Sequence, residues 1–346
     1  MTEAAPPKKA NRAGIVIPFG LVGLFLIGWT VWWFMVAGRV EAETDRSAAS
    51  LRQSGYQVSW SKREVTGWPF RSFVQLKDVR IVAPSGYSIT APELGAEAET
   101  YALGKWVVAA PKGLTLVRGD KGVLVVSGEA IRASLSGVGG PDPRFVLELR
   151  KPVFVPGAGA QGFPIGTADL IDFYLEPKAD SPDHQARFLF RMLNAQAPAG
   201  GTLDRLAHGQ ALSAEWQGVL TRTDAMHGHT WAEGAKNWAD AGGAITDSKA
   251  HVTAGKAVAD AASTRLAVSA DGRLTGPVEV DMQQGPAALL ALAGADKVDP
   301  TAAATLAAST AFEGLLNGGK AHVSVRFAPE GAYLGELRLA PAPKVY

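Results

Sequence analysis

The chain has 346 residues, 47% of them hydrophobic, and its 34 basic and 33 acidic residues nearly cancel. A formal net charge of +1 gives no electrostatic reason to expect a nucleic acid as partner. The absence of cysteine excludes disulfide bonds and thiolate chemistry. With 39 glycines and 21 prolines, the sequence favours many turns over long helices.

An apolar stretch without any charged side chain covers residues 13–38. About 20 apolar residues suffice to cross a hydrocarbon core of about 30 Å, whereas a cleaved signal peptide has an apolar region of only about 7–15 residues. We therefore expect an uncleaved transmembrane anchor, which makes the lipid bilayer a partner of residues 13–38. Trp29, Trp32 and Trp33 near the end of this stretch predict an aromatic belt at the membrane surface.

The charges that flank the anchor do not dictate its orientation. Three basic residues stand on either side of it: Lys8, Lys9 and Arg12 before it, and Arg39, Arg46 and Arg52 after it. Long C-terminal domains translocate largely regardless of such charges. We expect residues 1–12 to form a cytoplasmic tail and the rest of the chain to lie on the outer side of the membrane.

Residues 39–55 predict a juxtamembrane helix, because they are rich in helix formers and end at Gly55, a suitable residue for the position after a helix. From residue 56 onward the dominant pattern has a period of two. Tyr56, Val58 and Trp60 are the first of many apolar residues that alternate with polar ones. This alternation is typical of half-buried antiparallel strands.

The sequence thus predicts that residues 56–346 form a β-rich domain of the α+β class, mainly β with a few helices, built on a long curled antiparallel sheet. Helical patterns cover residues 231–239 and an insert near 285–317. Near residues 77–78 the apolar alternation slips by one residue, which predicts a β-bulge there.

Strands with one apolar face must cover that face, and the predicted strands outnumber the predicted helices several-fold. The sheet is therefore expected to fold onto itself as a groove, a half-barrel or a sandwich. A groove would leave an apolar surface for an acyl chain, and Phe173, Phe188 and Trp216 are its expected lining. In a closed sandwich the same side chains would be fully packed, and the sequence alone does not choose between these forms.

The motif Gly67-Trp68-Pro69-Phe70-Arg71 stands between two predicted strands. Pro69 fixes its own φ and favours an extended Trp68, while Gly67 tolerates a turn. The rings of Trp68 and Phe70 can bury large apolar areas. We interpret the motif as a structural corner at the entrance of a strand, with a contact between Arg71 and a lipid headgroup as the alternative.

This motif, the N-terminal anchor and a proline-bounded C-terminal hairpin that contains Leu334 and Gly335 resemble an uncharacterised alphaproteobacterial envelope family, domain of unknown function 2125. The family pattern usually begins Gly-(Phe/Tyr)-Pro-Phe-Arg, and Trp68 replaces its first aromatic residue conservatively. The resemblance spans nearly the whole chain, although residues 195–310 match little. It implies an inner-membrane anchor, a periplasmic β-rich domain and no known activity. The chain is more distantly similar to AsmA-like envelope proteins, whose β-grooves are linked to lipid transport.

No group of residues in the sequence supports an enzyme, so we expect no catalytic residue, no cofactor and no metal. Residues 157–162 match G-x-G-x-x-G, but a dinucleotide site needs a helix to begin there, and a strand pattern follows instead. His227 and His229 are close together, yet no third His or Cys stands at a usual ligand spacing. Asp172 and Glu176 share a strand face about 13 Å apart, and we interpret them as ordinary solvent-facing acids.

Two functions follow from these expectations. The first is a single-pass protein of the cell inner membrane, with its C-terminal domain in the periplasm, that binds or transfers lipid or another hydrophobic ligand in an apolar β-groove. The alternative is a non-catalytic envelope scaffold or assembly factor that binds other envelope proteins. A metal-dependent enzyme would require His227 and His229 to converge with an acid.

Overall fold

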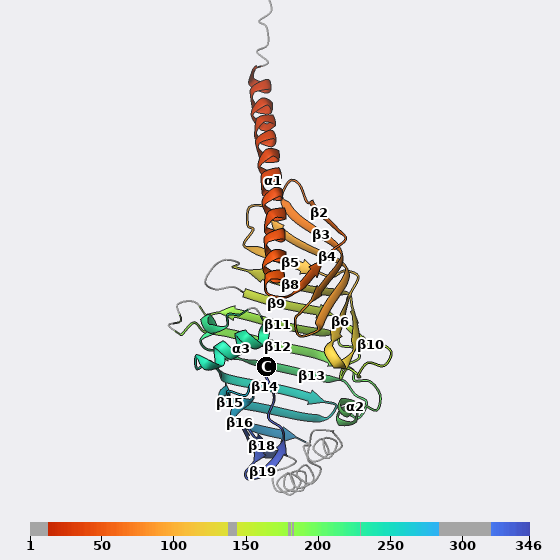
Figure 1. The fold of residues 1–346 in the computed structure, drawn as a ribbon, viewed down its shortest axis with the longest axis vertical. Helices are drawn as coiled ribbons and strands as arrows, with labels where there is room; N and C mark the ends of the chain where they lie inside the picture. The colour runs from red at the N-terminus through yellow and green to blue at the C-terminus, as the bar shows by residue number, and fades with distance from the viewer. Residues whose placement is uncertain (1–12, 138–143, 179–180, 182, 229, 284–319) are drawn as a thin grey trace, which may run out of the picture.

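A computed structural model describes residues 13–137, 144–178, 181, 183–228, 230–283 and 320–346. The described residues form one 19-stranded sheet, one long N-terminal helix and two short helices (Figure 1). The long helix continues the long axis of the sheet, and the strands run across that axis. The molecule is therefore elongated, with one end of the sheet at the helix and the other end far from it.

The N-terminal helix α1 (Ala13–Gln53) is 41 residues long and joins the expected anchor and the expected juxtamembrane helix without a break. It ends just before Gly55, whose φ of 84° is the left-handed conformation that favours glycine. In its second half the buried side chains recur at helical spacing, including Val36, Val40 and Ala48. This half of the helix therefore has one face that packs on the sheet.

The strands follow one another along the chain with short connections. The part of the sheet nearer to α1 consists of β1 (Gln57–Ser59), β2 (Lys62–Thr66), β3 (Arg71–Val82), β4 (Tyr87–Glu99), β5 (Lys105–Ala109), β6 (Leu114–Arg118), β7 (Val123–Ser127), β8 (Ala130–Ser136), β9 (Arg144–Arg150) and β10 (Val153–Pro156). The farther part consists of β11 (Leu170–Pro177), β12 (Ala186–Ala195), β13 (Leu212–Leu220), β14 (Ala244–Ala254), β15 (Ala257–Val268), β16 (Leu274–Gln283), β17 (Lys320–Ala328), β18 (Gly331–Leu334) and β19 (Leu337–Ala340).

All strand pairs are antiparallel, and the sheet divides at β4. One half of β4 pairs with β5, and the other half pairs with β6. From β5 a main ladder continues in the order β8, β9, β11, β12, β13, β14, β15, β16, β17, β18 and β19. From β6 a side branch continues through β7 to β10. The side branch lies on one face of the main ladder.

The slip in the apolar alternation near residues 77–78 is not a bulge, so that prediction is wrong. The register between β3 and β4 is the same on both sides of Asp78. Instead, Asp78 adopts a φ of 51°, a left-handed conformation that aspartate tolerates better than most residues. Val74 before this turn and Val79 after it are therefore both buried, although they are an odd number of residues apart.

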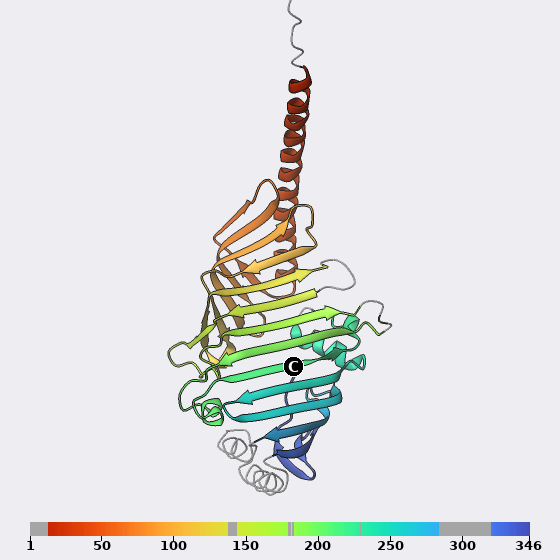
Figure 2. The ribbon, with the colours of Figure 1, turned by 180° about the vertical axis from the view of Figure 1, so that it is seen from behind.

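The two faces of the sheet differ in what covers them. The second half of α1, the side branch and the helices α2 (Thr202–Ala207) and α3 (Trp231–Asp240) all lie on one face (Figure 1). The opposite face is bare of these elements (Figure 2). Two short 3₁₀ turns, η1 (Gly119–Lys121) and η2 (Thr223–Ala225), complete the described secondary structure.

Buried apolar clusters lie between the covered face and its covering elements. Trp238 of α3 packs with Phe188 of β12, and Ala207 of α2 packs with Met192 at the other end of the same strand. The side branch shares a third cluster with β8 and β9, in which Leu124 is almost fully buried. The described core is thus divided into separate clusters, one under each covering element and a further one around Val323 among the last strands of the sheet.

The helix expected over residues 231–239 is confirmed as α3. It begins after Thr230, whose side-chain oxygen accepts a hydrogen bond from the Glu233 backbone N–H at 3.2 Å, an N-cap interaction. The helical insert expected near residues 285–317 lies outside the described residues. The short helix α2 was not predicted.

The predicted fold class is confirmed, because the described chain is mostly antiparallel sheet with a few helices behind an N-terminal apolar helix. The predicted curl of the sheet is not found. The sheet is single and uncurled, and in the described part of the chain no pairing joins β19 back to β1 or β2. The side branch and the helices cover parts of the apolar face, which removes the need for the sheet to fold onto itself along its whole length.

Candidate functional site

The motif of residues 67–71 forms the turn between β2 and β3 and docks against α1. The indole N–H of Trp29 donates to the carbonyl oxygen of Pro69 at 2.8 Å. The indole N–H of Trp33 donates to the carbonyl oxygen of Arg71 at 2.9 Å. Two of the tryptophans expected to form a membrane belt therefore also bind the first hairpin of the sheet to the helix.

The backbone of this turn requires glycine at position 67. Gly67 has a φ of 105°, and a Cβ atom added there would lie 2.6 Å from the carbonyl oxygen of Arg71. The Trp68–Pro69 peptide bond is cis. The side chain of Arg71 forms an ion pair with Glu97 on β4. The motif thus combines a tight turn, two hydrogen bonds to α1 and a charged pair at the start of the sheet.

Just beyond this turn, α1 becomes part of the core. Val36 and Val40 of the helix are buried against Val74 of β3, and the half-buried Leu76 and Trp106 pack around them. Helix residues as far as Ala48 are also buried. The sheet therefore rests directly on the second half of α1 and is not connected to it by a flexible linker.

The first half of α1, in contrast, is bare. Its large apolar side chains from Ile17 to Met35 are mostly more than half exposed. Among the described residues α1 is the one helix long and apolar enough to cross a membrane, and its most apolar stretch has a mean hydropathy of 1.9 and is only 11% buried. A single-pass anchor and a signal sequence both fit this description.

The covered face of the sheet carries a continuous row of apolar residues. Cross-strand partners lie on the same face of a sheet, and the observed registers place one apolar residue from each of thirteen strands in a single row: Val65, Val74, Ala96, Val108, Ala133, Leu147, Phe173, Phe190, Trp216, Ala250, Ala261, Val280 and Val323. With strands about 4.8 Å apart, the row is about 60 Å long.

The central part of this row is not fully covered. Its nine members from Val108 to Val280 are half-buried or exposed, and we refer to them as the apolar strip. Val74, at the helix end of the row, and Val323, at the far end, are both buried. Trp216 is 38% exposed in the middle of the strip. The strip therefore offers apolar surface to a ligand along about 40 Å of the sheet.

The three residues expected to line a groove have different environments. Phe173 is half-buried and Trp216 is exposed, and both belong to the apolar strip. Phe188 lies on the same face but is buried beneath Trp238 of α3. Its ring makes an edge-on contact with Trp216, with the ring centroids 4.8 Å apart. Phe188 therefore supports the exposed tryptophan from below and has little surface of its own for a ligand.

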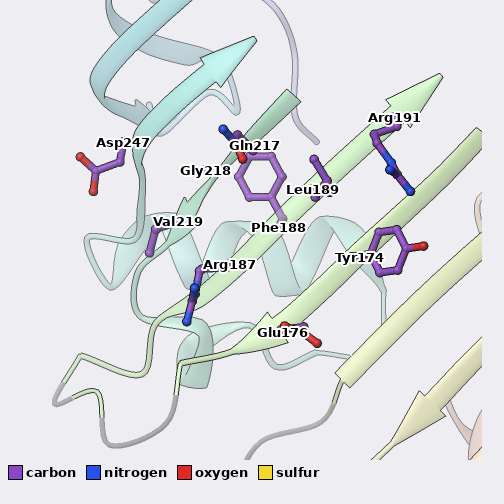
Figure 3. Close-up of a pocket in the computed structure, with 10 residues that line it drawn as sticks. All are labelled: Tyr174, Glu176, Arg187, Phe188, Leu189, Arg191, Gln217, Gly218, Val219 and Asp247. Carbon is purple, nitrogen blue, oxygen red and sulfur yellow. The ribbon is translucent and has the colours of Figure 1, made fainter. Parts of the chain in front are cut away.

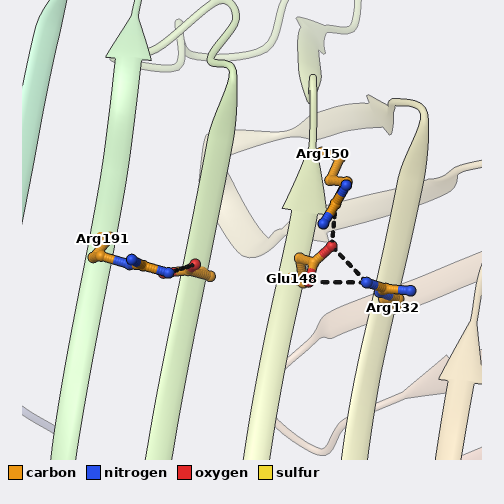
Figure 4. Close-up of polar contacts among 5 residues, drawn as sticks. Arg132, Glu148, Arg150 and Arg191 are labelled. Atoms are coloured by element: carbon orange, nitrogen blue, oxygen red, sulfur yellow. Dashed lines mark hydrogen bonds and ion pairs between the residues drawn. The ribbon is translucent and has the colours of Figure 1, made fainter.

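The bare face carries a row of charged residues directly behind this strip. The same registers align one residue from each of nine strands: Arg132, Glu148, Asp172, Arg191, Glu215, His251, Asp260, Asp281 and His322. Several of them form ion pairs with their neighbours, among them Arg132 with Glu148 and Arg191 with Asp172 (Figure 4). These pairs satisfy the charges without any covering element.

The interpretation of Asp172 as a solvent-facing acid is wrong. Its side chain is only 1% exposed, and Arg191 binds both carboxylate oxygens, with N–O distances of 2.6 and 3.1 Å. The hydrogen bond that Arg191 donates to Asp172 raises the pKa of Arg191. Glu176, four residues farther along the strand on the same face, is exposed as expected. The guanidinium of Arg191 thus shields one acid of the polar face from solvent.

The neighbouring Glu148 is also paired. Burial raises the pKa of this carboxyl group, but hydrogen bonds from Arg132 and Arg150 outweigh burial and lower the pKa overall. The Glu148 carboxylate accepts hydrogen bonds from Arg132 at 2.9 and 3.0 Å. Neither Asp172 nor the half-buried Glu148 is therefore left as an uncompensated charge of the kind that would point to general acid–base chemistry.

A pocket of about 440 Å³ lies on the same polar face (Figure 3). Side chains from four strands line it, and the polar ones among them are Tyr174, Glu176, Arg187, Arg191, Gln217 and Asp247. Phe188, Leu189, Gly218 and Val219 complete the lining, so the pocket offers apolar surface within a rim that carries both signs of charge.

The motifs considered for chemistry do not assemble into a site. The glycine-rich segment at residues 157–162 forms a loop after β10, and no helix begins there. In the described part of the chain no group of three or more His, Asp or Glu residues is placed to hold a metal ion. His227 is exposed, and His229 lies outside the described residues.

The arrangement as a whole defines a class of protein in which an apolar helix carries an uncurled antiparallel sheet with one apolar and one charged face. The family model described as an uncharacterized protein conserved in bacteria, DUF2125, matches residues 33–343. The chain therefore belongs to this family, and the predicted resemblance is confirmed. The match begins at Trp33, the first buried residue among the described side chains of α1. Comparisons with curated proteins and with solved structures gave no match.

Proposed function

We propose that this chain is a single-pass protein of the cell inner membrane whose periplasmic sheet binds, and moves along its apolar face, a lipid or another hydrophobic ligand. The observation that carries this proposal is the apolar strip, an in-register series of incompletely covered apolar side chains. Near its helix end the row includes Val74, which packs on α1 itself. A ligand leaving the bilayer beside α1 would thus find apolar surface continuing away from the membrane.

Retention of the helix as an anchor is supported by its packing. A cleaved signal sequence is lost from the mature protein, whereas α1 is one unbroken helix whose second half contributes Val36 and Val40 to the core. Cleavage close to Trp33 would leave a truncated and frayed helix end at the point where Trp33 binds the first hairpin. We therefore propose that residues 13–38 remain in the bilayer.

Two measurements test anchor and orientation separately. Mass spectrometry of the purified protein is expected to give the full-length mass, and loss of the first 25 to 35 residues would contradict the anchor. Because the chain lacks cysteine, a Ser85→Cys variant provides a single thiol in an exposed turn. A membrane-impermeant maleimide should label it from the periplasmic side, and labelling only after rupture of the inner membrane would reverse the orientation.

The ligand is tested by photocrosslinking at adjacent positions of β13. Trp216 lies on the apolar strip, and Gln217 lies on the charged face of the same strand and is also exposed. With p-benzoylphenylalanine in place of Trp216, irradiation in cells is expected to give a phospholipid adduct detectable by mass. The same replacement of Gln217 should give none. Equal adducts at both positions, or no lipid adduct at Trp216, would count against the proposal.

A scaffold or assembly factor for other envelope proteins is the second candidate. Burial of Phe188 beneath Trp238 favours it, because a packed residue offers no ligand surface. The bare charged face with its pocket also offers area for a protein partner. The same experiment separates the two functions, since a scaffold predicts protein adducts at Gln217 and no lipid adduct at Trp216.

A further inference from the structure

We propose that the turns at the membrane end of the sheet form a second contact with the bilayer, in which Trp68, Phe70 and Tyr101 insert into the lipid headgroup region beside α1. This inference rests on the proposed anchor and goes beyond it, because a transmembrane helix alone does not require the sheet to touch the membrane. The partner is the lipid surface of the same bilayer that holds α1.

The first observation is that large aromatic side chains are exposed together at this end. Trp68 and Phe70 in the β2–β3 turn are 53% and 61% exposed, and Tyr101 in the β4–β5 turn is 64% exposed. The backbone N–H of Thr100 donates to the carbonyl oxygen of Phe70 at 3.0 Å, so the two turns are neighbours. A cluster of exposed aromatic residues is typical of an interaction surface, whereas exposed aromatic residues that stand singly are common on any protein.

The second observation is the height of these turns along α1. The hydrogen bonds of Trp29 and Trp33 to the β2–β3 turn fix it beside those helix positions. At 1.5 Å per residue, these positions lie about 24 to 30 Å from Ala13, which is close to the thickness of a hydrocarbon core. If the apolar half of α1 spans the bilayer, the turn lies at the outer boundary of the hydrocarbon.

The apolar surface is continuous from the helix to the turn. The ring of Phe70 lies 6.0 Å from that of Trp29, and Trp29 contacts Phe25 on the bare part of the helix. The indole N–H of Trp68 donates to the hydroxyl of Thr30 at 3.3 Å. Aromatic side chains with one apolar and one polar part prefer the membrane interface to either water or hydrocarbon.

Charged residues immediately behind the aromatic side chains limit the depth of insertion. Arg71 follows Phe70 and forms an ion pair with Glu97, and both side chains are exposed. An ion pair at this position is suited to the headgroup region and unfavourable in hydrocarbon. The other end of β3 differs, since its turn carries Pro84, Ser85 and Gly86, and one exposed aromatic residue, Tyr87, follows it instead of a group of three. Exposed aromatic side chains are therefore concentrated at the end of the sheet that we propose to contact lipid.

The test uses the full-length chain in vesicles of phosphatidylcholine and phosphatidylglycerol and a polarity-sensitive fluorophore on single cysteines, which the cysteine-free sequence permits. Phe70→Cys and Tyr101→Cys report on the two turns. Leu24→Cys on the bare part of α1 is the buried-in-lipid reference, and Ser85→Cys is the reference in water.

For Phe70→Cys and Tyr101→Cys we expect blue-shifted emission and quenching by doxyl lipids several-fold stronger than for Ser85→Cys. If the turn has a merely structural role, aqueous iodide will quench the probes at positions 70 and 101 as strongly as the Ser85 probe, while the Leu24 probe stays protected. That result would overturn the second contact but would leave the proposed anchor standing. A Leu24 probe open to iodide would overturn both the anchor and this contact.

Discussion

At the scale of single residues, Gly67 shows most directly how the sequence determines the junction between α1 and the sheet. Alanine at this position must keep an unfavourable φ of 105° and place its Cβ against the Arg71 carbonyl oxygen. We expect Gly67→Ala to lower the free energy of unfolding by about 2–3 kcal/mol, measured by urea denaturation in detergent micelles.

Gly86 is a matched control for this change. It also has a positive φ, of 83°, but a Cβ atom there would meet no other atom within 4 Å. Gly86→Ala should therefore cost only the conformational term, about 1 kcal/mol. Equal losses for the two variants would mean that the contact with Arg71 relaxes freely and that the turn is not tightly built.

Asp172 leads to a second prediction at this scale. Its carboxylate is buried and receives two hydrogen bonds from Arg191. Asp172→Asn keeps the size of the side chain but removes the charge, and the cost of breaking a largely buried pair is about 2 kcal/mol or more. The change is measured by the same denaturation assay.

The control for Asp172 is Glu176→Gln on the same strand and face, where the side chain is exposed. Substitutions at such surface positions usually change stability by less than about 0.5 kcal/mol. A small effect of Asp172→Asn, similar to that of the control, would contradict the importance of the Arg191 pair.

These residues also show what the sequence could and could not predict. The turn at Gly67 and Pro69 was predictable because glycine and proline act on their own backbone. The burial of Asp172 was not, because it depends on Arg191 of another strand and therefore on the register between strands. The contacts of the turn with Trp29 and Trp33 were not predictable either, because these residues precede the turn by about 40 positions. Their sequence context predicted only a place at the membrane surface.

At the scale of secondary-structure elements, the β16–β17 pair predicts a pH dependence of stability. The Nδ1 atom of His322 lies 2.8 Å from Asp281 Oδ1, and its Nε2 atom lies 3.2 Å from Glu279 Oε2. The hydrogen bond with Asp281, followed by the attraction of both acids, raises the pKa of His322 above its ordinary value of 6.5.

The direction of the effect follows from this raised pKa. A group whose pKa is higher in the folded state contributes stability below the unfolded-state pKa and loses it as the pH rises through the folded-state pKa. We expect His322→Gln to reduce the free energy of unfolding more at about pH 5.5 than at about pH 8.5. In the His322→Gln background, Asp281→Asn should cause no further change in how the free energy of unfolding depends on pH near neutrality. If Asp281→Asn does change that dependence, a group other than His322 is responsible for it.

The elements themselves were predictable to different degrees. Strands such as β12 alternate clearly because one face is covered and the other is bare. The sequence of the second half of α1 also indicates a buried face, since Trp33, Val36 and Val40 recur at helical spacing. The first half is apolar on all sides, so the sequence does not show where this buried face begins. The slip near Asp78 predicts a change of the buried face, but it does not reveal that a left-handed residue causes that change.

At the scale of the whole molecule, the open form of the sheet could not be derived from alternation. Alternation states that one face is apolar, but it does not say whether another sheet, a helix or a ligand covers it. The chain covers that face locally, with α3 over Phe188 and α2 over Met192, and leaves the apolar strip between the clusters incompletely covered. The continuity of this strip depends on eight strand registers, which no local pattern specifies.

The continuity of the strip leads to a prediction about direction. If a hydrophobic ligand enters beside α1 and moves along the strip, a charge at one position should stop it there, because transfer of an acyl chain past an unpaired charge is unfavourable. Ala261 of β15 lies between Ala250 and Val280 in the row and is half-buried. Ala261→Glu is therefore expected to preserve lipid crosslinking at Trp216 and to reduce it several-fold at Val280.

The adjacent Ala262 provides the control, because it is exposed on the charged face of the same strand. Ala262→Glu should leave crosslinking unchanged at both Trp216 and Val280. Loss of crosslinking at both positions in the Ala261→Glu variant, with normal unfolding, would indicate a single binding site that includes β13 to β16. Unchanged crosslinking at both would show that ligands reach each part of the sheet independently, and the apolar row would then be a structural core feature and not a path from the membrane.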